Sequence, residues 1–417
     1  MVYLSPDVPR WEPRSEAELH VAIASGLLEE NHFLDLKREV PSGKSGNAEL
    51  ARDLVQFAID GGAVLIGVDE KGGPSDEPAL TPTPLKGLAE RIEQIARSTP
   101  DPPLEVTCRV IQSDADPTLG YVLVRVPISR VGLHMVNHVY FGRGDKTKYR
   151  LSDPEVRRRL KDYELDLRAA EAELDNYVGR DPIVRSSVGE PPVRLFLTAV
   201  PLANRTPLLG DLLSGSDYHG LVYSLIESVG EADKSNLHGF FRTTREATPS
   251  YDKLSSPARR TDGVAASFGL SVERDLGNGD PVAQLPWAVG EVEFSYDGHV
   301  RAMAAPFSYV RRDQVLVDSA GIARFTRLFP GLVESVANIS GYTGSWLLGM
   351  SVGGLAGLRA DIAPYSVPYE NDRYQMTAAA TLEEIQRTPG KVTRRLSERL
   401  FLALDVADQH ERFLTDQ

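Results

Sequence analysis

Three acidic residues and one lysine, all before residue 70, have the types and spacing needed for metal-dependent chemistry. The segment ENHFLDLKRE contains Glu30, Asp35 and Lys37, and the apolar segment AVLIGVD ends in Asp69. Polar and apolar residues alternate in HFLDLKREV, which predicts a β-strand with Asp35 and Lys37 side by side on one face. If Glu30 and Asp69 approach that strand, three carboxylates converge beside one ammonium group.

A cluster of this composition is suited to a hard divalent cation. Carboxylate oxygens are the ligands that Mg²⁺ and Mn²⁺ prefer, and such an ion can hold a phosphate and activate a water molecule. Lys37 would offset the charge that develops on the phosphorus oxygens. The residues therefore indicate phosphodiester hydrolysis, with Glu30, Asp35 and Asp69 as metal ligands. The alternative is that these side chains are solvated residues at strand ends.

The surrounding segments predict a mixed sheet with flanking helices. Ser15 and Glu18 have the spacing of a capping box that opens a short amphipathic helix. After the strand at HFLDLKREV, PSGKSG predicts a loop, residues 50–58 a helix, and AVLIGVD a buried strand. A helix over 85–97 and strands at LEVTCRVI and YVLVRVPI follow.

These motifs, taken in order, resemble the Schlafen AlbA-like domain over about residues 16–160. The resemblance rests on E(x4)DLK, on ELARDLVQFAIDGGAVLIGVDEKG and on GLHMVNHVYFGRGDKT. It implies a metal-dependent ribonuclease that cleaves structured, tRNA-like RNA, with Glu30, Asp35 and Asp69 as the catalytic acids and Lys37 as the adjacent base. The second acid is Asp where Glu is commoner in the family. Since the chain has a single lobe, the resemblance also implies a homodimer.

One basic stretch lies inside this otherwise acidic protein. Residues 125–161 carry ten Lys or Arg residues and three Asp or Glu residues. Aromatic and cationic side chains together are typical of surfaces that stack bases and contact phosphates. The predicted nucleic-acid contacts are Lys44, His134, Tyr140, Arg143, Lys146, Lys148 and Arg150. The alternative for this stretch is a solvated basic hairpin.

Two metal or nucleotide motifs in the same region are disfavoured. VPSGKSG lacks the first glycine of a phosphate-binding loop, because Arg38 occupies that position, so Lys44 is expected in an exposed loop. His134 and His138 are four residues apart, but their segment has an extended pattern, which favours structural or RNA-contacting roles over zinc binding.

Composition limits the class of protein. The formal charge of −13 argues against indiscriminate coating of nucleic acid, although it leaves room for a local basic groove. Cys108 is the single cysteine, so we expect neither internal disulfides nor a zinc site built from cysteines. For the same reason we expect a cytoplasmic location. The sequence contains no long apolar run, so no membrane span is predicted.

The chain is expected to form two domains of an α+β protein. The first, residues 1–178, is the Schlafen AlbA-like mixed sheet with a trailing charged helix that begins at a second capping box, Ser152 and Glu155. Residues 179–191 are predicted to be a linker. Residues 192–417 are predicted to form an α/β-type regulatory or recognition domain of unknown topology, in which GSWLLGMSVGGL favours a core helix and TLEEI starts another helix.

These observations lead to one main hypothesis and two alternatives. The main hypothesis is a Mn²⁺- or Mg²⁺-dependent ribonuclease of Schlafen type, whose family analogy points to bacterial defence or stress responses. The first alternative is a non-catalytic DNA- or RNA-binding regulator in which the acids order the basic segment. The second is a scaffold that binds other proteins.

Overall fold

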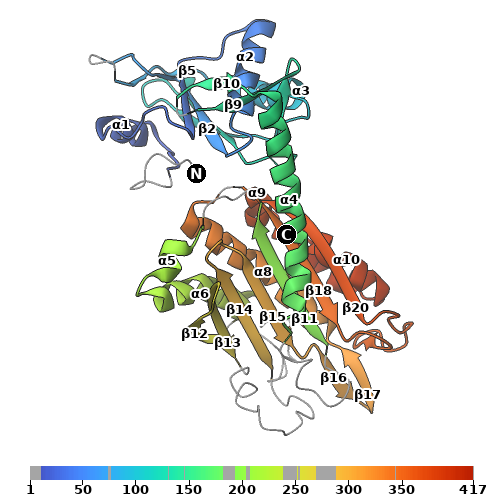
Figure 1. Cartoon of the computed structure of the whole chain (residues 1–417). Helices are drawn as coiled ribbons and strands as arrows, with labels where there is room; N and C mark the ends of the chain where they lie inside the picture. Colours follow the sequence, from blue (N-terminus) through green and yellow to red (C-terminus); the bar gives the residue numbers. More distant parts are fainter. Residues whose placement is uncertain are drawn as a thin grey trace. The chain divides into compact units, whose positions relative to one another are not determined.

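The computed structural model describes two compact units (Figure 1). The described residues are 11–73, 77–129, 131–144, 146–181, 193–202, 207–237, 251, 254–268, 288–342 and 344–416. Residues 1–166 and 343–345 form the N-terminal unit, and residues 167–342 and 346–417 form the C-terminal unit. The division falls inside helix α4 (Asp153–Val178), ahead of the linker predicted at 179–191, most of which lies outside the described residues.

The N-terminal unit is built on a five-stranded mixed sheet. Strand β1 pairs parallel with β2, which pairs antiparallel with β7, and β5 and β6 also pair antiparallel with β7. The strands are β1 (Leu34–Lys37), β2 (Gly62–Ile66), β5 (Thr83–Pro84), β6 (Thr107–Gln112) and β7 (Leu119–Val126). The mixed sheet that the sequence predicted is therefore present.

Helices cover both faces of this sheet. Helix α1 (Glu16–Ala24) packs with Leu34 and Leu36 of β1 in one hydrophobic cluster. Helices α2 (Gly43–Val55) and α3 (Leu88–Ser98) pack with Val64 and Ile66 of β2 in a second cluster. Because side chains alternate along a strand, Asp35 and Lys37 project to the face that α2 covers.

Two local predictions for this unit need correction. PSGKSG is not a loop throughout, because α2 already begins at Gly43, after Ser42 at the N-cap position. AVLIGVD is not one strand, because Gly67 has a positive φ of 96° and separates β2 from the short β3 (Val68–Asp69), which pairs with β4 (Ala79–Leu80).

A smaller three-stranded sheet carries the middle of the basic segment. It consists of β8 (Met135–Val136), β9 (Val139–Arg143) and β10 (Lys148–Arg150), joined in antiparallel pairs. Asn137 and His138 both have positive φ and form the two-residue turn between β8 and β9, as type I′ hairpins require.

The C-terminal unit contains a seven-stranded sheet in the order β12-β13-β14-β15-β11-β18-β20 (Figure 1). The adjacent strands from β12 to β18 pair antiparallel, so the expected α/β-type domain is an α+β arrangement. The strands are β11 (Arg194–Pro201), β12 (Ser255–Arg259), β13 (Gly263–Phe268), β14 (Val289–Ser295), β15 (Val300–Ala305), β18 (Ser345–Gly353) and β20 (Arg373–Thr381).

The prediction of a core helix at GSWLLGMSVGGL was wrong. This segment forms β18, which lies between β11 and β20 and is buried at every residue. A strand that is covered on both faces has no polar alternation, so its sequence resembles that of a buried helix.

Helices cover this sheet as well. Leu174, Tyr177 and Val178 of α4 pack on Phe196 of β11, while α8 (Ser319–Ser340) contacts β11 and β15. The helix start predicted at TLEEI is confirmed, because Thr381 and Glu384 form a capping box that opens α9 (Leu382–Arg387). The remaining elements are α5 (Gly210–Ser214), α6 (Tyr218–Leu237), β16 (Ser308–Arg311), β17 (Gln314–Val317), β19 (Arg359–Ala360), α10 (Pro389–Ala403), a 3₁₀ turn (Asp408–His410) and α11 (Glu411–Leu414).

In the part of the chain that the structure describes, every helix is too short or too polar to cross a lipid bilayer.

Candidate functional site

Asp35 lies at the centre of a buried charged cluster on the α2 side of strand β1. The side chain of Lys37 extends beside it, with Nζ 2.8 Å from Asp35 Oδ2. On the other oxygen, Arg143 Nη1 lies 3.4 Å from Asp35 Oδ1. Asp35 is only 4% exposed, so these two cations compensate a carboxylate that has little contact with water.

Arg143 holds this cluster in place from strand β9. Its Nε donates to the carbonyl oxygen of Asn31 and its Nη2 to that of Leu34, both at 2.9 Å. Its guanidinium lies over the ring of Phe57, 4.9 Å from the ring centre. Arg143 was predicted to contact nucleic acid, but its side chain is buried, so the structure gives it the role of fixing β1 and Asp35.

Glu30 lies against the same carboxylate. The backbone N–H of Leu36 donates to Glu30 Oε1 at 3.0 Å, which directs the carboxyl group towards β1. Burial, followed by the negative charge of Asp35, raises the pKa of Glu30 to about 7, although the Leu36 hydrogen bond and Lys37 oppose the shift. Near neutral pH, this carboxyl pair is thus poised to hold or release one proton.

Asp53 is a third acid of the cluster, which the sequence analysis did not identify. It lies on α2, is 3% exposed, and forms an ion pair with Lys148 of β10, while Lys37 Nζ is 4.0 Å from its Oδ2. Burial raises the pKa of Asp53, while Lys37 and Lys148 oppose the shift. A signal was present, because Asp53 is a charged residue on the apolar face marked by Leu50, Leu54 and Phe57.

Asp69 makes different contacts from the other predicted acids. Its Oδ2 lies 3.8 Å from Arg38 Nη1, and its Oδ1 accepts a hydrogen bond of 3.2 Å from the backbone N–H of Lys71. Within the described ranges, no three Asp, Glu, His or Cys side chains are arranged to share one metal ion. Joint metal binding by Glu30, Asp35 and Asp69 thus remains a prediction, and it would require Asp69 to leave Arg38.

Three exposed cations of the basic segment lie on and next to β10. Lys148, Tyr149 and Arg150 are all exposed, and Lys146 is exposed with its Nζ 3.9 Å from Glu29 Oε2. Because Lys148 also pairs with Asp53, it links this surface to the charged cluster. Tyr140 is partly exposed on β9.

Two other predicted contact residues have different positions. Lys44 is exposed in the first turn of α2, not in a loop. His134 is 3% exposed, donates from Nδ1 to the carbonyl oxygen of Pro102 at 2.7 Å, and contacts Ser129 Oγ through Nε2 at 2.6 Å. Burial lowers the pKa of His134. The predicted nucleic-acid contact by His134 is therefore replaced by a structural role, and His138 lies apart in the exposed turn.

The cluster has features that fit a divalent cation and features that oppose one. Glu30 lies beside Asp35 and retains its proton in part near pH 7, and a cation could replace that proton. Against this, Lys37 and Lys148 already pair with Asp35 and Asp53. Glu30 and Asp35 therefore suit two ligand positions of a metal, and the adjacent lysine suits an anionic oxygen.

Comparison of the chain with protein-family models and with curated proteins found no match.

Proposed function

We propose that the N-terminal unit is a metal-dependent nuclease of Schlafen type that hydrolyses phosphodiester bonds in structured RNA. The observation that carries the proposal is the buried position of Glu30 against Asp35: burial, followed by the charge of Asp35, raises the pKa of Glu30 to about 7 beside Lys37. Strongly perturbed carboxyl groups next to a specific charge partner are more frequent at functional sites than elsewhere. The motif resemblance described above supports the same chemistry.

Each residue of this cluster would have a separate role in catalysis. Glu30 and Asp35 would hold Mn²⁺ or Mg²⁺, which supplies a Lewis acid and lowers the pKa of a bound water. Lys37 would place its ammonium group beside a phosphate oxygen, and Arg143 would keep Asp35 in position. Lys146, Lys148 and Arg150 would contact the RNA backbone.

Cleavage assays with matched variants test this proposal. Full-length protein is incubated with total tRNA and with Mn²⁺ or Mg²⁺, beside Glu30→Gln and the adjacent Glu29→Gln, whose side chain is 67% exposed. We expect Glu30→Gln to abolish cleavage and Glu29→Gln to retain it. If the wild type cleaves neither RNA nor DNA with either metal, or if Glu30→Gln cleaves normally, the enzyme proposal is wrong.

Asp69→Asn examines the third predicted ligand separately. If Asp69 leaves Arg38 to bind the metal, this variant loses cleavage although Glu30 and Asp35 are unchanged. Cleavage at the wild-type rate would remove Asp69 from the site and leave the carboxyl pair as its acidic component.

A second function, non-catalytic binding of DNA or RNA, is favoured by a different observation. Asp35 is paired with Arg143 and Asp53 with Lys148, both from the basic segment, as expected if the acids serve to order that segment. Gel retardation by the wild type and by Glu30→Gln, without cleavage in either case, would support this function in place of the first.

The single lobe leads us to propose a homodimer as well, since two copies would be needed to enclose a duplex. Sedimentation velocity of the full chain measures this, and a monomer at micromolar concentration, with or without RNA, would contradict it.

A further inference from the structure

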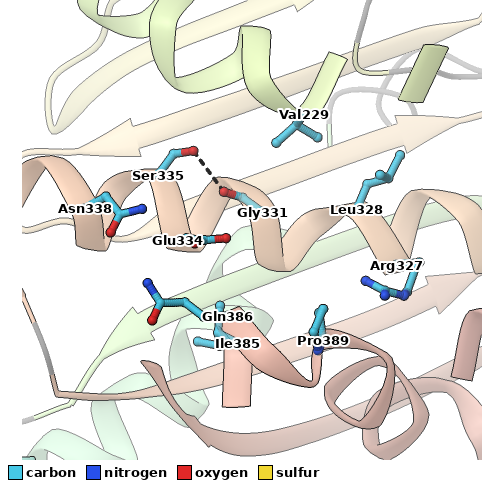
Figure 2. A pocket seen from close by; sticks show the side chains of 10 residues that line it. All are labelled: Val229, Arg327, Leu328, Gly331, Glu334, Ser335, Asn338, Ile385, Gln386 and Pro389. Carbon is cyan, nitrogen blue, oxygen red and sulfur yellow. Dashed lines mark hydrogen bonds between the residues drawn. The ribbon is translucent and has the colours of Figure 1, made fainter. Parts of the chain in front are cut away.

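A groove in the C-terminal unit is lined along one side by a single stripe of helix α8. Arg327, Gly331, Glu334 and Asn338 follow one another at spacings of four, three and four, so they share one face of the helix. Gly331 has no side chain, and Val229 of α6 packs close to it: a Cβ on Gly331 would lie 3.2 Å from Val229 Cγ2. The resulting pocket has a volume of about 440 Å³, a size typical of small-ligand sites (Figure 2).

The opposite wall is formed by α9 and the start of α10. Figure 2 shows Ile385, Gln386 and Pro389 on the side towards which Arg327 and Glu334 extend. Val229 of α6 and Leu328 of α8 add further apolar surface. The groove therefore combines apolar walls with a few polar groups, which is the usual composition of a binding site.

Three of the polar groups in this groove have no partner in the described part of the chain. Glu334, Asn338 and Gln386 make no hydrogen bond or ion pair with those residues, although Glu334 and Asn338 are only partly exposed. A carboxylate in such a position gains most from a cationic hydrogen-bond donor. The two amides can each donate to a carbonyl oxygen and accept from an N–H group.

Arg327 supplies a positive charge two helical turns away from Glu334. Its Nη2 lies 3.7 Å from Asp416 Oδ1, and the same Asp416 carboxylate accepts hydrogen bonds from the backbone N–H groups of Gly390 and Lys391. Burial lowers the pKa of Arg327, and Asp416 offsets this only in part. The guanidinium would therefore be stabilised by a second anionic oxygen.

The order of charges along α8 restricts what the groove can bind. Arg327 and Glu334 are seven residues apart, which corresponds to about 10 Å along the helix. A ligand can pair with both side chains if it has a carboxylate at one end, an amine at the other, and a distance between these groups of up to about 10 Å. Polyphosphates fit poorly, since Glu334 repels them. Amide groups between the two ends would match Asn338 and Gln386.

We propose that this groove binds a short peptide, of two or three residues, with a free amino terminus beside Glu334 and a free carboxyl terminus beside Arg327. An apolar side chain of the peptide would lie against Val229, Leu328 and Ile385. The groove would thus be a binding site for small peptides in the C-terminal unit, and this role does not depend on the chemistry of the N-terminal unit.

Calorimetric titration of the full-length protein with the tripeptide Ala-Leu-Ala tests the proposal. The matched ligands are the N-acetylated tripeptide, which lacks the ammonium, and the C-terminal amide, which lacks the carboxylate. We expect each modification to weaken binding by roughly tenfold, since each removes one charge-assisted interaction. Because these changes are made on the ligand, the protein fold is the same in all three titrations.

Protein variants then assign each end of the ligand to a residue. In Glu334→Gln, the free and N-acetylated peptides should bind with equal affinity, and in Arg327→Gln the acid and the amide should do so. Glu383→Gln and Arg387→Gln, which alter an exposed ion pair on α9 outside the pocket lining, should bind like the wild type. No binding of Ala-Leu-Ala at millimolar concentration, or equal binding of all three ligands by the wild type, would overturn the proposal.

Discussion

Glu30 is a carboxyl group that the fold keeps partly protonated. Its folded pKa of about 7 exceeds the ordinary value of 4.5, first because it is buried and then because Asp35 lies beside it. Between about pH 4.5 and pH 7 the unfolded chain gives up this proton while the folded protein retains it. Stability must therefore fall as pH rises through that window, and the loss is complete above it.

Glu30→Gln removes this penalty while keeping the size of the side chain. We expect the variant and the wild type to have similar melting temperatures at pH 5, and the variant to melt higher at pH 8. Thermal unfolding monitored by circular dichroism at both values measures the difference. Glu29→Gln is the control and should follow the wild type at each pH. A variant that melts lower than the wild type at pH 8 would show that the Glu30 carboxylate is stabilised, not penalised, in the fold.

The environment of His410 predicts the opposite effect, a loss of stability as pH falls. It is 2% exposed, with Nε2 3.0 Å from Ser319 Oγ, which in turn donates to Asp361 at 3.1 Å. Burial lowers the pKa of His410 to about 4, with Asp361 raising it and Arg412 lowering it. Because the unfolded residue titrates near 6.5, stability is lost as pH falls from about 6.5 to about 4, by about 3 kcal/mol at the acid end.

His410→Gln, which retains a hydrogen-bonding group and does not titrate, should reduce this acid sensitivity. Urea unfolding at pH 7 and pH 5 gives the two free energies of unfolding. The decrease between them should be smaller in the variant than in the wild type. An equal decrease in both proteins would assign the acid sensitivity to other groups.

At the level of elements, Gly349 on β18 lies close to both strand β11 and helix α4. A Cβ at this position would lie 2.6 Å from Thr198 Oγ1 of β11 and 3.1 Å from Leu174 Cδ2 of α4. Gly349→Ala is thus an overpacking substitution, expected to cost about 1–3 kcal/mol. Gly215→Ala, where the nearest contacts begin at 3.4 Å and φ is −62°, should change stability much less. Chemical unfolding of both variants measures this, and equal stabilities would mean that α4 moves freely away from the sheet.

Elements with a regular pattern of polar and apolar residues or a capping motif were predictable from the sequence. Strand β18 has neither signal, and its prediction failed. The alternation at β1 and the capping box at α9 each depend on neighbouring residues, and both are confirmed. The run SWLLGMSVG has no period because both of its faces are covered. Its place between β20 and β11, the latter more than 140 residues earlier in the chain, fixes it as a strand.

In the candidate site too, contacts between neighbouring residues were predictable, and contacts between distant segments were not. Alternation along β1 predicted that Asp35 and Lys37 would lie together, and they do. The contacts of Arg143 and of Lys148 with residues about 100 positions earlier depend on how β9 and β10 fold back. For this reason the burial of Arg143 could not be predicted from the sequence, and the position of Asp53 on the apolar face of α2 was the one local signal that it joins the cluster.

On the scale of the whole molecule, the charge distribution predicts how nucleic acid would bind. The chain has a net charge of −13, so attraction to a polyanion must come from a local surface. Lys146, Tyr149 and Arg150 are exposed on or next to β10, and Lys44 is exposed on α2. Binding through so few cations should be weak, and the affinity should decrease with salt along a correspondingly small slope.

Replacing Lys146 and Arg150 together by alanine tests whether this surface contacts phosphates. The plot of log K against log salt concentration has a negative slope, and each lost phosphate contact reduces its magnitude by about 0.7–0.9. The double variant should therefore reduce the magnitude by about 1.5. Fluorescence anisotropy with labelled tRNA at several salt concentrations measures the slope. Arg387→Ala, which removes a cation on the C-terminal unit, should leave it unchanged. Since both variants remove surface charge, an equal reduction by Arg387→Ala would mean that RNA responds to total charge and not to the β10 surface.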